Sequence, residues 1–162
     1  MWWAQLPEAT PAATTAHLET QPDSREAQPP PIIARAIALI TQLLEGGKPD
    51  LNQIDCDFGD LPPFNTDVYA ATRAIPPGET LTYGDIAQQL GDKRLAQQVG
   101  GVLGRNPLPI IVPCHRVVGA DGKLTGFSAY GGTEAKRRML TIEGAKLEAA
   151  APGLFDDLPI TQ

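Results

Sequence analysis

Residues 107–118, PLPIIVPCHRVV, constrain the fold more than any other stretch of the chain. They are rich in β-branched residues and interrupted by prolines, so they cannot continue as a helix. Their aliphatic character favours burial. The pattern predicts a buried extended segment, around which the rest of the chain packs. The segment carries one of the chain's two cysteines, Cys114, directly before His115 and Arg116.

The pair Cys114–His115 suggests nucleophilic chemistry. A cysteine attacks as its thiolate, and a free thiol with a pKa of about 8.5 supplies little of it at neutral pH. His115 is the nearest base in sequence, but neighbouring side chains of an extended segment point in opposite directions. A turn beginning at Pro113, or a water molecule, is needed to connect them, and Glu143 is a candidate to orient the imidazole. The alternative is a small buried cysteine beside a histidine with purely structural contacts.

Length and composition limit the other possibilities. A chain of 162 residues with 42% hydrophobic residues predicts one main domain. Two cysteines allow neither a disulfide framework nor a four-ligand zinc set, even with His17 and His115 counted. We therefore expect no metal and no cofactor. No apolar stretch reaches membrane-spanning length and no signal peptide is visible, so we expect no membrane partner and a cytoplasmic or nucleoid-associated location.

The charge is unevenly distributed. A net charge of −6 argues against a nucleic-acid partner, because phosphate contacts need positive potential. However, residues 83–146 hold nine Lys or Arg against five Asp or Glu, and the remainder holds four against fourteen. This distribution predicts a partly basic working surface, although a solvated surface of mixed charge gives the same count.

The first part of the chain divides at residue 30. Residues 1–30 are rich in proline and show no helical or strand period, so we expect them to be disordered. Residues 31–60 form a reduced N-terminal region: an amphipathic helix runs from Pro31 to the Gly46-Gly47 stop, and residues 52–58 are a short strand or an extended connection. Cys56 is expected only to pack.

The main domain is predicted to span residues 61–146, before an acidic tail at 147–162. A helix follows Pro62-Pro63, with Asn65 or Thr66 as its cap. Two short helices, TYGDIAQQLG with Thr82 as its cap and LAQQVGGVLGRN, are joined by the basic turn Asp92-Lys93-Arg94. This arrangement is typical of a helix-turn-helix, although such pairs also occur as ordinary core architecture.

The last part of the domain is predicted to contain a turn, a brief strand and a helix. GADGKLTGF supplies the turn and the strand, Thr133 caps the helix, and Gly144 ends it. Upstream, Gly100 and Gly101 lie inside a predicted helix, where each costs about 1 kcal/mol relative to alanine. Glycines in such positions let a backbone or a ligand approach closely.

Three runs, IPPGETLTYGDIAQQLG, NPLPIIVPCHRVVGADGKLTGFSAYGG and KRRMLTIEG, together resemble one family. They are similar to the O6-alkylguanine-DNA alkyltransferases, also called methylated-DNA–protein-cysteine methyltransferases, and the resemblance extends from about Phe64 to Gly144. It implies a mainly α fold with short β-strands, in which a winged helix-turn-helix-like C-terminal alkyltransferase domain follows a reduced N-terminal segment.

The resemblance also implies an activity. The family repairs DNA by one irreversible transfer of an alkyl group from O6 of guanine, or from O4 of thymine, to a cysteine of the protein. The damaged nucleotide flips out of the helix first, because its O6 substituent cannot reach a sulfur while the base is stacked. The expected protein is therefore a single-turnover methylated-DNA–protein-cysteine S-methyltransferase, a monomer whose partner is alkylated, double-stranded DNA.

The family pattern assigns roles to the chain's own residues. Cys114 corresponds to the nucleophile, His115 to the base acting through water, and Glu143 to the carboxylate that orients it. Asn106 would brace the turn before the cysteine, and Tyr83 would hydrogen-bond a ring nitrogen of the flipped base.

Two further sets of residues follow from the resemblance. The backbone carbonyls of Cys114 and Val117 would accept from the exocyclic amine of the base, and the backbone near Ser128 would donate to O6. The expected substrate-binding set is Val117, Ser128, Phe127, Pro113 and Arg116. The expected DNA-binding set is Gln97, Gly100, Gly101, Arg94 and Arg105. Gln97 departs from the family, which usually has an arginine there to fill the space of the flipped base.

Two other functions stay open from the sequence. A non-enzymatic module that binds alkylated DNA and recruits other repair factors, as the alkyltransferase-like proteins do, would not need the acceptor cysteine. Retention of Cys114 argues against that function, whereas Gln97 and the acidic tail favour it. A cysteine hydrolase would need an oxyanion site, of which the sequence gives no sign.

Overall fold

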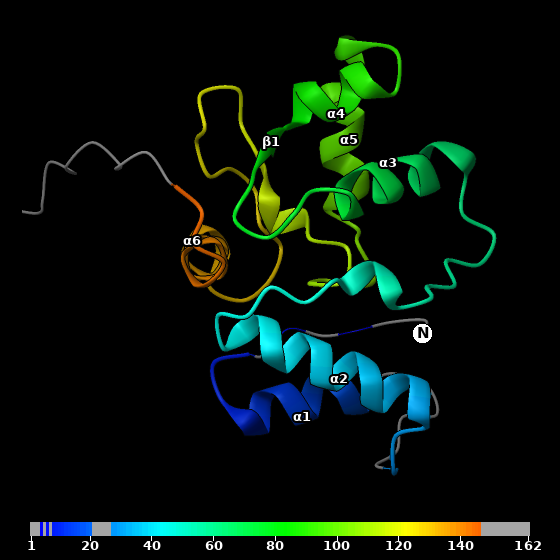
Figure 1. The fold of residues 1–162 in the computed structure, drawn as a ribbon, viewed down its shortest axis with the longest axis vertical. Coiled ribbons are helices and arrows are strands. Elements are labelled where there is room, and N and C mark those ends of the chain that lie inside the picture. Colours follow the sequence, from blue (N-terminus) through cyan, green and yellow to red (C-terminus); the bar gives the residue numbers. More distant parts are fainter. Residues whose placement is uncertain (1–3, 5, 7, 21–26, 147–162) are drawn as a thin grey trace, which may run out of the picture.

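The computed structural model describes residues 4, 6, 8–20 and 27–146. Within them the fold is mainly helical with one small sheet, as the sequence predicts (Figure 1). The helices are α1 (Pro11–Glu19), α2 (Pro31–Leu44), α3 (Pro63–Arg73), α4 (Tyr83–Gln89), α5 (Ala96–Leu103) and α6 (Gly132–Ile142). Strands β1 (Leu81–Thr82) and β2 (Val117–Val118) pair in parallel, and three 3₁₀ turns complete the elements: η1 (Leu51–Gln53), η2 (Lys93–Leu95) and η3 (Cys114–Arg116).

Figure 1 shows how these elements surround the short sheet. Helices α3, α4 and α5 pack against one another on one side of it, and α6 lies on the other side, against η3. Helices α1 and α2 form a separate layer at one end of the molecule. No helix among the described residues has the length and apolar character needed to cross a membrane.

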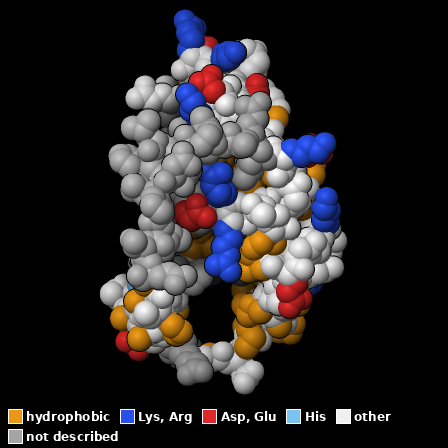
Figure 2. All heavy atoms as spheres, turned by 90° about the vertical axis from the view of Figure 1, so that its left-hand side faces the viewer, with side chains coloured by type: hydrophobic (Ala, Val, Ile, Leu, Met, Phe, Trp, Pro, Cys, Tyr) orange, Lys and Arg blue, Asp and Glu red, His pale blue; other side chains and the backbone are white. Residues whose placement is uncertain are grey.

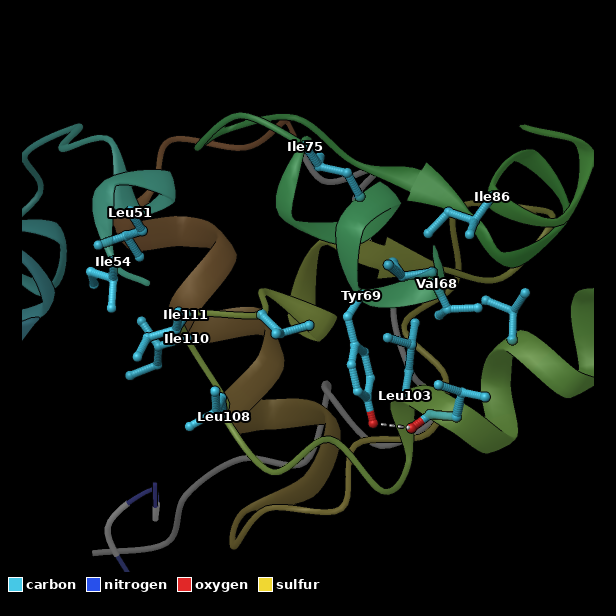
Figure 3. Packing of buried hydrophobic residues seen from close by; sticks show 14 of the residues in the cluster. Leu51, Ile54, Val68, Tyr69, Ile75, Ile86, Leu103, Leu108, Ile110 and Ile111 are labelled. Atoms are coloured by element: carbon cyan, nitrogen blue, oxygen red, sulfur yellow. Dashed lines mark hydrogen bonds between the residues drawn. The ribbon is translucent and has the colours of Figure 1, made fainter. Parts of the chain in front are cut away.

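The segment 107–118 is buried, as predicted, and forms part of the core (Figure 3). Its aliphatic residues pack beside Tyr69 of α3, whose hydroxyl donates to the Val102 carbonyl of α5 at 3.4 Å. The prediction of a fully extended backbone is wrong. Ile110 has a φ of 75°, a strained conformation for a β-branched residue that costs about 1–3 kcal/mol.

A second turn in this segment contains the cysteine. The amide of Arg116 donates to the Pro113 carbonyl at 2.9 Å, which closes η3. Pro113 precedes this turn as its cap residue, in the position where a turn would be needed to bring Cys114 and His115 to the same site.

Helix starts differ from two of the predictions. Helix α3 begins at Pro63 with Pro62 as cap, so neither Asn65 nor Thr66 caps it; proline at the first position has no amide that needs a partner. Helix α6 is preceded by Gly131, whose φ of 83° turns the chain into the helix ahead of Thr133. Thr82 does cap α4, in a reciprocal capping box with Asp85.

The prediction that no helix forms in residues 1–30 is wrong for α1. Thr10 accepts from the amide of Ala13 at 3.1 Å, and Pro11 occupies the first helical position. The proline-rich stretch therefore starts a helix, because its next proline comes only at Pro22. None of the residues of α1 is buried.

In residues 31–60 the predicted helix is present, and the short strand considered for residues 52–58 is not. Helix α2 forms as predicted, but it buries only Ala36 and Leu43 and leaves Ile32 and Ile37 exposed. Residues 52 and 53 belong to η1, and residues 54–58 form a connection without helix or strand, where Cys56 packs against the core with a free thiol. The brief strand predicted after Gly119 is absent: that segment makes a turn, in which the Gly119 amide donates to the Lys123 carbonyl. The acidic tail at 147–162 lies outside the described residues.

Candidate active site

The sulfur of Cys114 borders a cavity of about 430 Å³. Helices α4 and α5 form one side of this cavity, and the loop at 125–128 forms the other. Its lining residues are Tyr83, Gly100, Leu103, Gly104, Cys114, Thr125, Gly126, Phe127 and Ser128. Cys114 as a residue is partly exposed, and it lines this cavity. Among the residues predicted from the sequence, the structure brings Tyr83, Gly100, Phe127 and Ser128 together around the cysteine.

Asn106 connects the end of α5 to the cysteine turn. Its side-chain amide donates to the Val112 carbonyl at 2.8 Å and to Sγ of Cys114 at 3.4 Å. Its side-chain oxygen accepts from the Leu108 amide at 3.0 Å. The predicted bracing contacts are therefore present, and one of them reaches the sulfur itself.

Behind the cysteine lies a buried cluster of three charged or titratable side chains. Oε1 of Glu143 is 2.9 Å from Nε2 of His115 and accepts from Nη2 of Arg116 at 2.8 Å, while Oε2 accepts from Arg116 Nε at 2.9 Å. Arg116 also donates to the Ile75 carbonyl. Burial alone would raise the pKa of Glu143, but the hydrogen bonds from His115 and Arg116 outweigh it and hold that pKa at about 2.

The ionised Glu143 fixes the tautomer of His115. A carboxylate only accepts hydrogen bonds, so Nε2 of His115 carries the proton and Nδ1 carries the lone pair. Burial lowers the pKa of His115, which keeps the imidazole neutral at pH 7 although Glu143 favours the charged form. Nδ1 is buried and has no hydrogen-bond partner among the described residues. The ring thus offers one free lone pair in the interior, as a general base requires.

The thiol of Cys114 needs such a base. Burial raises its pKa above the ordinary value, and the hydrogen bond from Asn106 and the charge of Lys136 act in the opposite direction. The resting cysteine is therefore a thiol at neutral pH, and its deprotonation depends on neighbouring groups.

Lys136 of α6 is the residue that sequence reasoning missed. It is fully buried, and its Nζ donates to the Val117 carbonyl at 2.6 Å and to the Thr125 carbonyl at 3.0 Å. Nζ also lies 5.9 Å from the centre of the Tyr83 ring. Burial lowers its pKa to about 8. The sequence held a signal: Lys136 precedes Met139, Leu140 and Glu143 at helical spacing, on the buried face of α6.

Tyr83 forms a wall of the cavity at the start of α4. Its hydroxyl donates to the Thr125 carbonyl at 3.5 Å, which links the helix to the opposite loop. Burial raises its pKa, so the phenol stays protonated and can donate a hydrogen bond to a group in the cavity.

Three of the predicted substrate-binding side chains lie elsewhere. Pro113 and Arg116 line a separate hollow beside Arg73 and Ile75, and Arg116 is held by Glu143, so the structure does not bring Arg116 to the cavity beside Cys114. Val117 is fully buried, and its carbonyl already accepts from Lys136. A carbonyl has a second lone pair, so this bond still leaves one acceptor site on Val117.

The predicted DNA-binding residues lie on or near α5. Gln97, Gly101, Arg94 and Arg105 are exposed, whereas Gly100 lines the cavity. A Cβ at Gly100 would lie 3.7 Å from the Tyr83 ring, in ordinary contact, and at Gly101 only the end of Arg105 lies near. Neither glycine is thus required by the fold. Figure 2 shows that basic side chains on the face it presents stand apart, with acidic and apolar groups between them.

Within the part of the chain that the structure describes, no group of three or more His, Cys, Asp or Glu side chains is arranged to hold a metal ion.

Residues 63–145 match the family model of the 6-O-methylguanine DNA methyltransferase DNA-binding domain, which is about half of the chain. The chain belongs to the methylated-DNA–protein-cysteine methyltransferase family. A methyltransferase of this name from Methanothermobacter thermautotrophicus is 35% identical over 125 residues, which cover 77% of this chain and 69% of that protein. One from Methanosarcina acetivorans is 48% identical over 82 residues, about half of each chain.

A solved structure of a family member shows the same fold. The Mycobacterium tuberculosis protein, crystallised in complex with DNA, is 40% identical and superposes with a TM-score of 0.61. The superposition covers 68% of this chain and 66% of that one. The domain that contains Cys114 therefore has the fold of this methyltransferase family. The part of this chain that aligns spans between half and about two thirds of the length of these relatives.

Proposed function

We propose that this chain repairs DNA by transferring one alkyl group from O6 of guanine to Sγ of Cys114. The observation that supports this function best is that Cys114 lines a cavity of about 430 Å³ and is followed directly in the chain by His115, whose buried ring is hydrogen-bonded to Glu143. That volume lies within the range of about 300–1,000 Å³ found for small-molecule sites.

The reaction begins with deprotonation of Cys114. The thiol proton passes through a water molecule to Nδ1 of His115, whose lone pair is unused and whose tautomer is fixed by Glu143. The developing imidazolium is stabilised by the carboxylate, which stays ionised because its pKa is about 2. His115 and Glu143 thus supply a general base and its orienting group.

The transfer itself is a single displacement at carbon. The S–C bond forms as the C–O6 bond breaks, and the electron pair of that bond goes to the guanine. The hydroxyl of Tyr83 donates to a ring nitrogen as the negative charge develops there, and the neutral phenol is the state that can do so. The product is a thioether, which a neutral imidazole cannot cleave, so each molecule acts once.

The partner in this proposal is double-stranded DNA carrying alkylated guanine, bound by a monomer. Helices α4 and α5, joined through η2, form the helix pair, and Gln97 stands exposed on the second helix. The base has to leave the stack before its O6 substituent can enter the cavity, because the sulfur lies inside the protein surface. DNA in the solved structure of the Mycobacterium tuberculosis relative supports this partner.

Intact mass tests the function directly. The protein is incubated with a duplex oligonucleotide that contains one O6-methylguanine, and we expect the mass to increase by one methyl group. Cys114→Ser should abolish the increase. Cys56→Ser should retain it, because Cys56 is also a partly buried free thiol but lies outside the cavity.

Other results would assign another function. Binding of the damaged duplex without an increase in mass would contradict transfer and support a lesion-binding module. Conversion of many substrate molecules by each protein would also contradict the proposal, because a thioether product ends the activity of its own molecule.

A further inference from the structure

The sulfur of Cys114 borders a second hollow, of about 180 Å³, on another side. This hollow shares Cys114, Phe127 and Ser128 with the first cavity. Its other lining residues are Asn106, Pro109, Ala129 and Tyr130 of the domain and, from the N-terminal segment, Ala4, Leu6, Glu8 and His17. The first twenty residues of the chain, which the sequence pattern predicts to be disordered, therefore contribute to the surroundings of the reactive sulfur.

The geometry of displacement gives this hollow a use. In an in-line attack the sulfur, the carbon and the leaving oxygen lie on one line, and the other substituents of the carbon project sideways. A methyl group projects only hydrogens, but any larger alkyl group needs room beside that line. When the base occupies the first cavity, the second hollow is the space next to the sulfur that is left for the substituent.

The size and lining of the hollow fit such a group. A cavity of about 150 Å³ in another protein holds benzene, so about 180 Å³ is enough for a benzyl ring. Leu6 and Pro109 supply apolar walls. At the edge, Nδ1 of His17 and Oε1 of Glu8 lie 3.0 Å apart, so the rim is polar.

The N-terminal wall is attached to the domain by few contacts. The amide of Ala4 donates to the Pro107 carbonyl at 2.9 Å, and Leu6 packs partly buried against the core. The amide of Glu8 donates to Thr14 Oγ1 at 2.9 Å, which ties Glu8 to α1. Because Leu6 is only partly buried and α1 buries none of its residues, changes at Leu6 should leave the main domain folded.

We propose that Ala4, Leu6, Glu8 and His17 form a wall of the alkyl-accepting site, and that Leu6 limits the size of the alkyl group transferred to Cys114. This inference rests on the proposed function, because it concerns the same sulfur. The ligand class it names is an O6 substituent larger than methyl, up to the size of a benzyl group.

The test changes the wall and compares two substrates. Duplexes containing O6-methylguanine or O6-benzylguanine are reacted with the wild type, Leu6→Trp and Leu18→Trp, and single-turnover rates are followed by intact mass. Leu6→Trp fills the hollow, so we expect about a 10-fold or greater loss of benzyl transfer, the scale on which pockets discriminate by size, with methyl transfer within about 2-fold. Leu18→Trp is the matched control, since Leu18 is 38% exposed on the same segment outside the hollow.

Other results would contradict either the role of the wall or the proposed function. If Leu6→Trp slows both substrates equally, or neither, the wall does not contact the substituent. Wild type that transfers methyl but not benzyl also contradicts the inference, whereas wild type that transfers neither contradicts the proposed function itself. Thermal unfolding checks the fold of each variant, and Leu6→Phe, which adds less volume, should change the benzyl-to-methyl ratio in the same direction by a smaller factor.

Discussion

Glu143→Gln should separate the structural and the chemical roles of the buried cluster. The substitution keeps the shape of the side chain but removes the charge that faces His115 and Arg116. Breaking a buried ion pair by removing one partner costs about 3–5 kcal/mol, because the remaining charge stays uncompensated. Since 1 kcal/mol shifts the Tm of a domain of this size by about 2–4 °C, we expect the Tm to fall by about 6–20 °C at pH 7.

The same variant should change how stability depends on pH. The pKa of Glu143 is about 2 in the folded protein and 4.5 in a model carboxyl, so the native state binds fewer protons than the unfolded state between these values. Its contribution to stability is complete above pH 4.5 and is lost as the pH falls toward 2. At 1.36 kcal/mol per pKa unit this amounts to about 3 kcal/mol.

Urea unfolding followed by circular dichroism between pH 7 and pH 2.5 measures this contribution. The difference in unfolding free energy between the wild type and Glu143→Gln should shrink as the pH drops below 4.5. Glu134→Gln is the control, because Glu134 lies on the same helix with its side chain 80% exposed. A difference that stays constant over the whole range would refute the assignment of the depressed pKa to Glu143.

The chemical role predicts a loss of activity as well. The glutamine amide can donate to Nε2 of His115, which would place the ring proton on Nδ1. Nδ1 would then have no lone pair to accept the proton of the Cys114 thiol. Loss of a general base typically costs about 10²–10⁴ in rate, so methyl transfer to Cys114 should slow by that order at pH 7. Transfer at the wild-type rate by folded Glu143→Gln would refute the role of His115 as the base.

Two further predictions concern residues on either side of the cavity. Lys136→Met removes the side-chain donor to the Val117 carbonyl and leaves the Thr125 carbonyl with only the Tyr83 hydroxyl, which should cost about 1–3 kcal/mol in urea unfolding, and it removes a charge that lowers the pKa of Cys114. The midpoint of the pH–rate profile for transfer should therefore move to higher pH, and an unchanged midpoint would contradict this effect. Gln97→Arg should increase the transfer rate from a duplex more than Gln98→Arg, its exposed neighbour on α5, and equal rates in both would show that position 97 has no special role.

The sequence by itself determined most of the helices, although it missed α1, and it indicated Cys114 as the candidate nucleophile. Thr82 and Asp85 form the capping box of α4 within four consecutive residues, so the start of that helix depends on no distant contact. Burial of residues 107–118 follows from their aliphatic composition, whereas the turn that contains Cys114 was only one of two alternatives that the sequence left open. The family resemblance rests on runs of neighbouring residues, and the domain it indicated, from about Phe64 to Gly144, agrees with residues 63–145, which match the family model.

Only the tertiary structure decided which residues surround the sulfur. Lys136 was missed, and Arg116 was assigned to the wrong site, because their partners lie 11 to 41 residues away in the chain. The N-terminal segment was misjudged for the same reason: Ala4 is held by the Pro107 carbonyl, and no local pattern records that contact. Helix caps and hydrophobic periodicity involve residues within one or two helical turns, so they can be recognised in the sequence. A buried charge or a cavity wall depends on groups from distant parts of the chain, which only folding brings together.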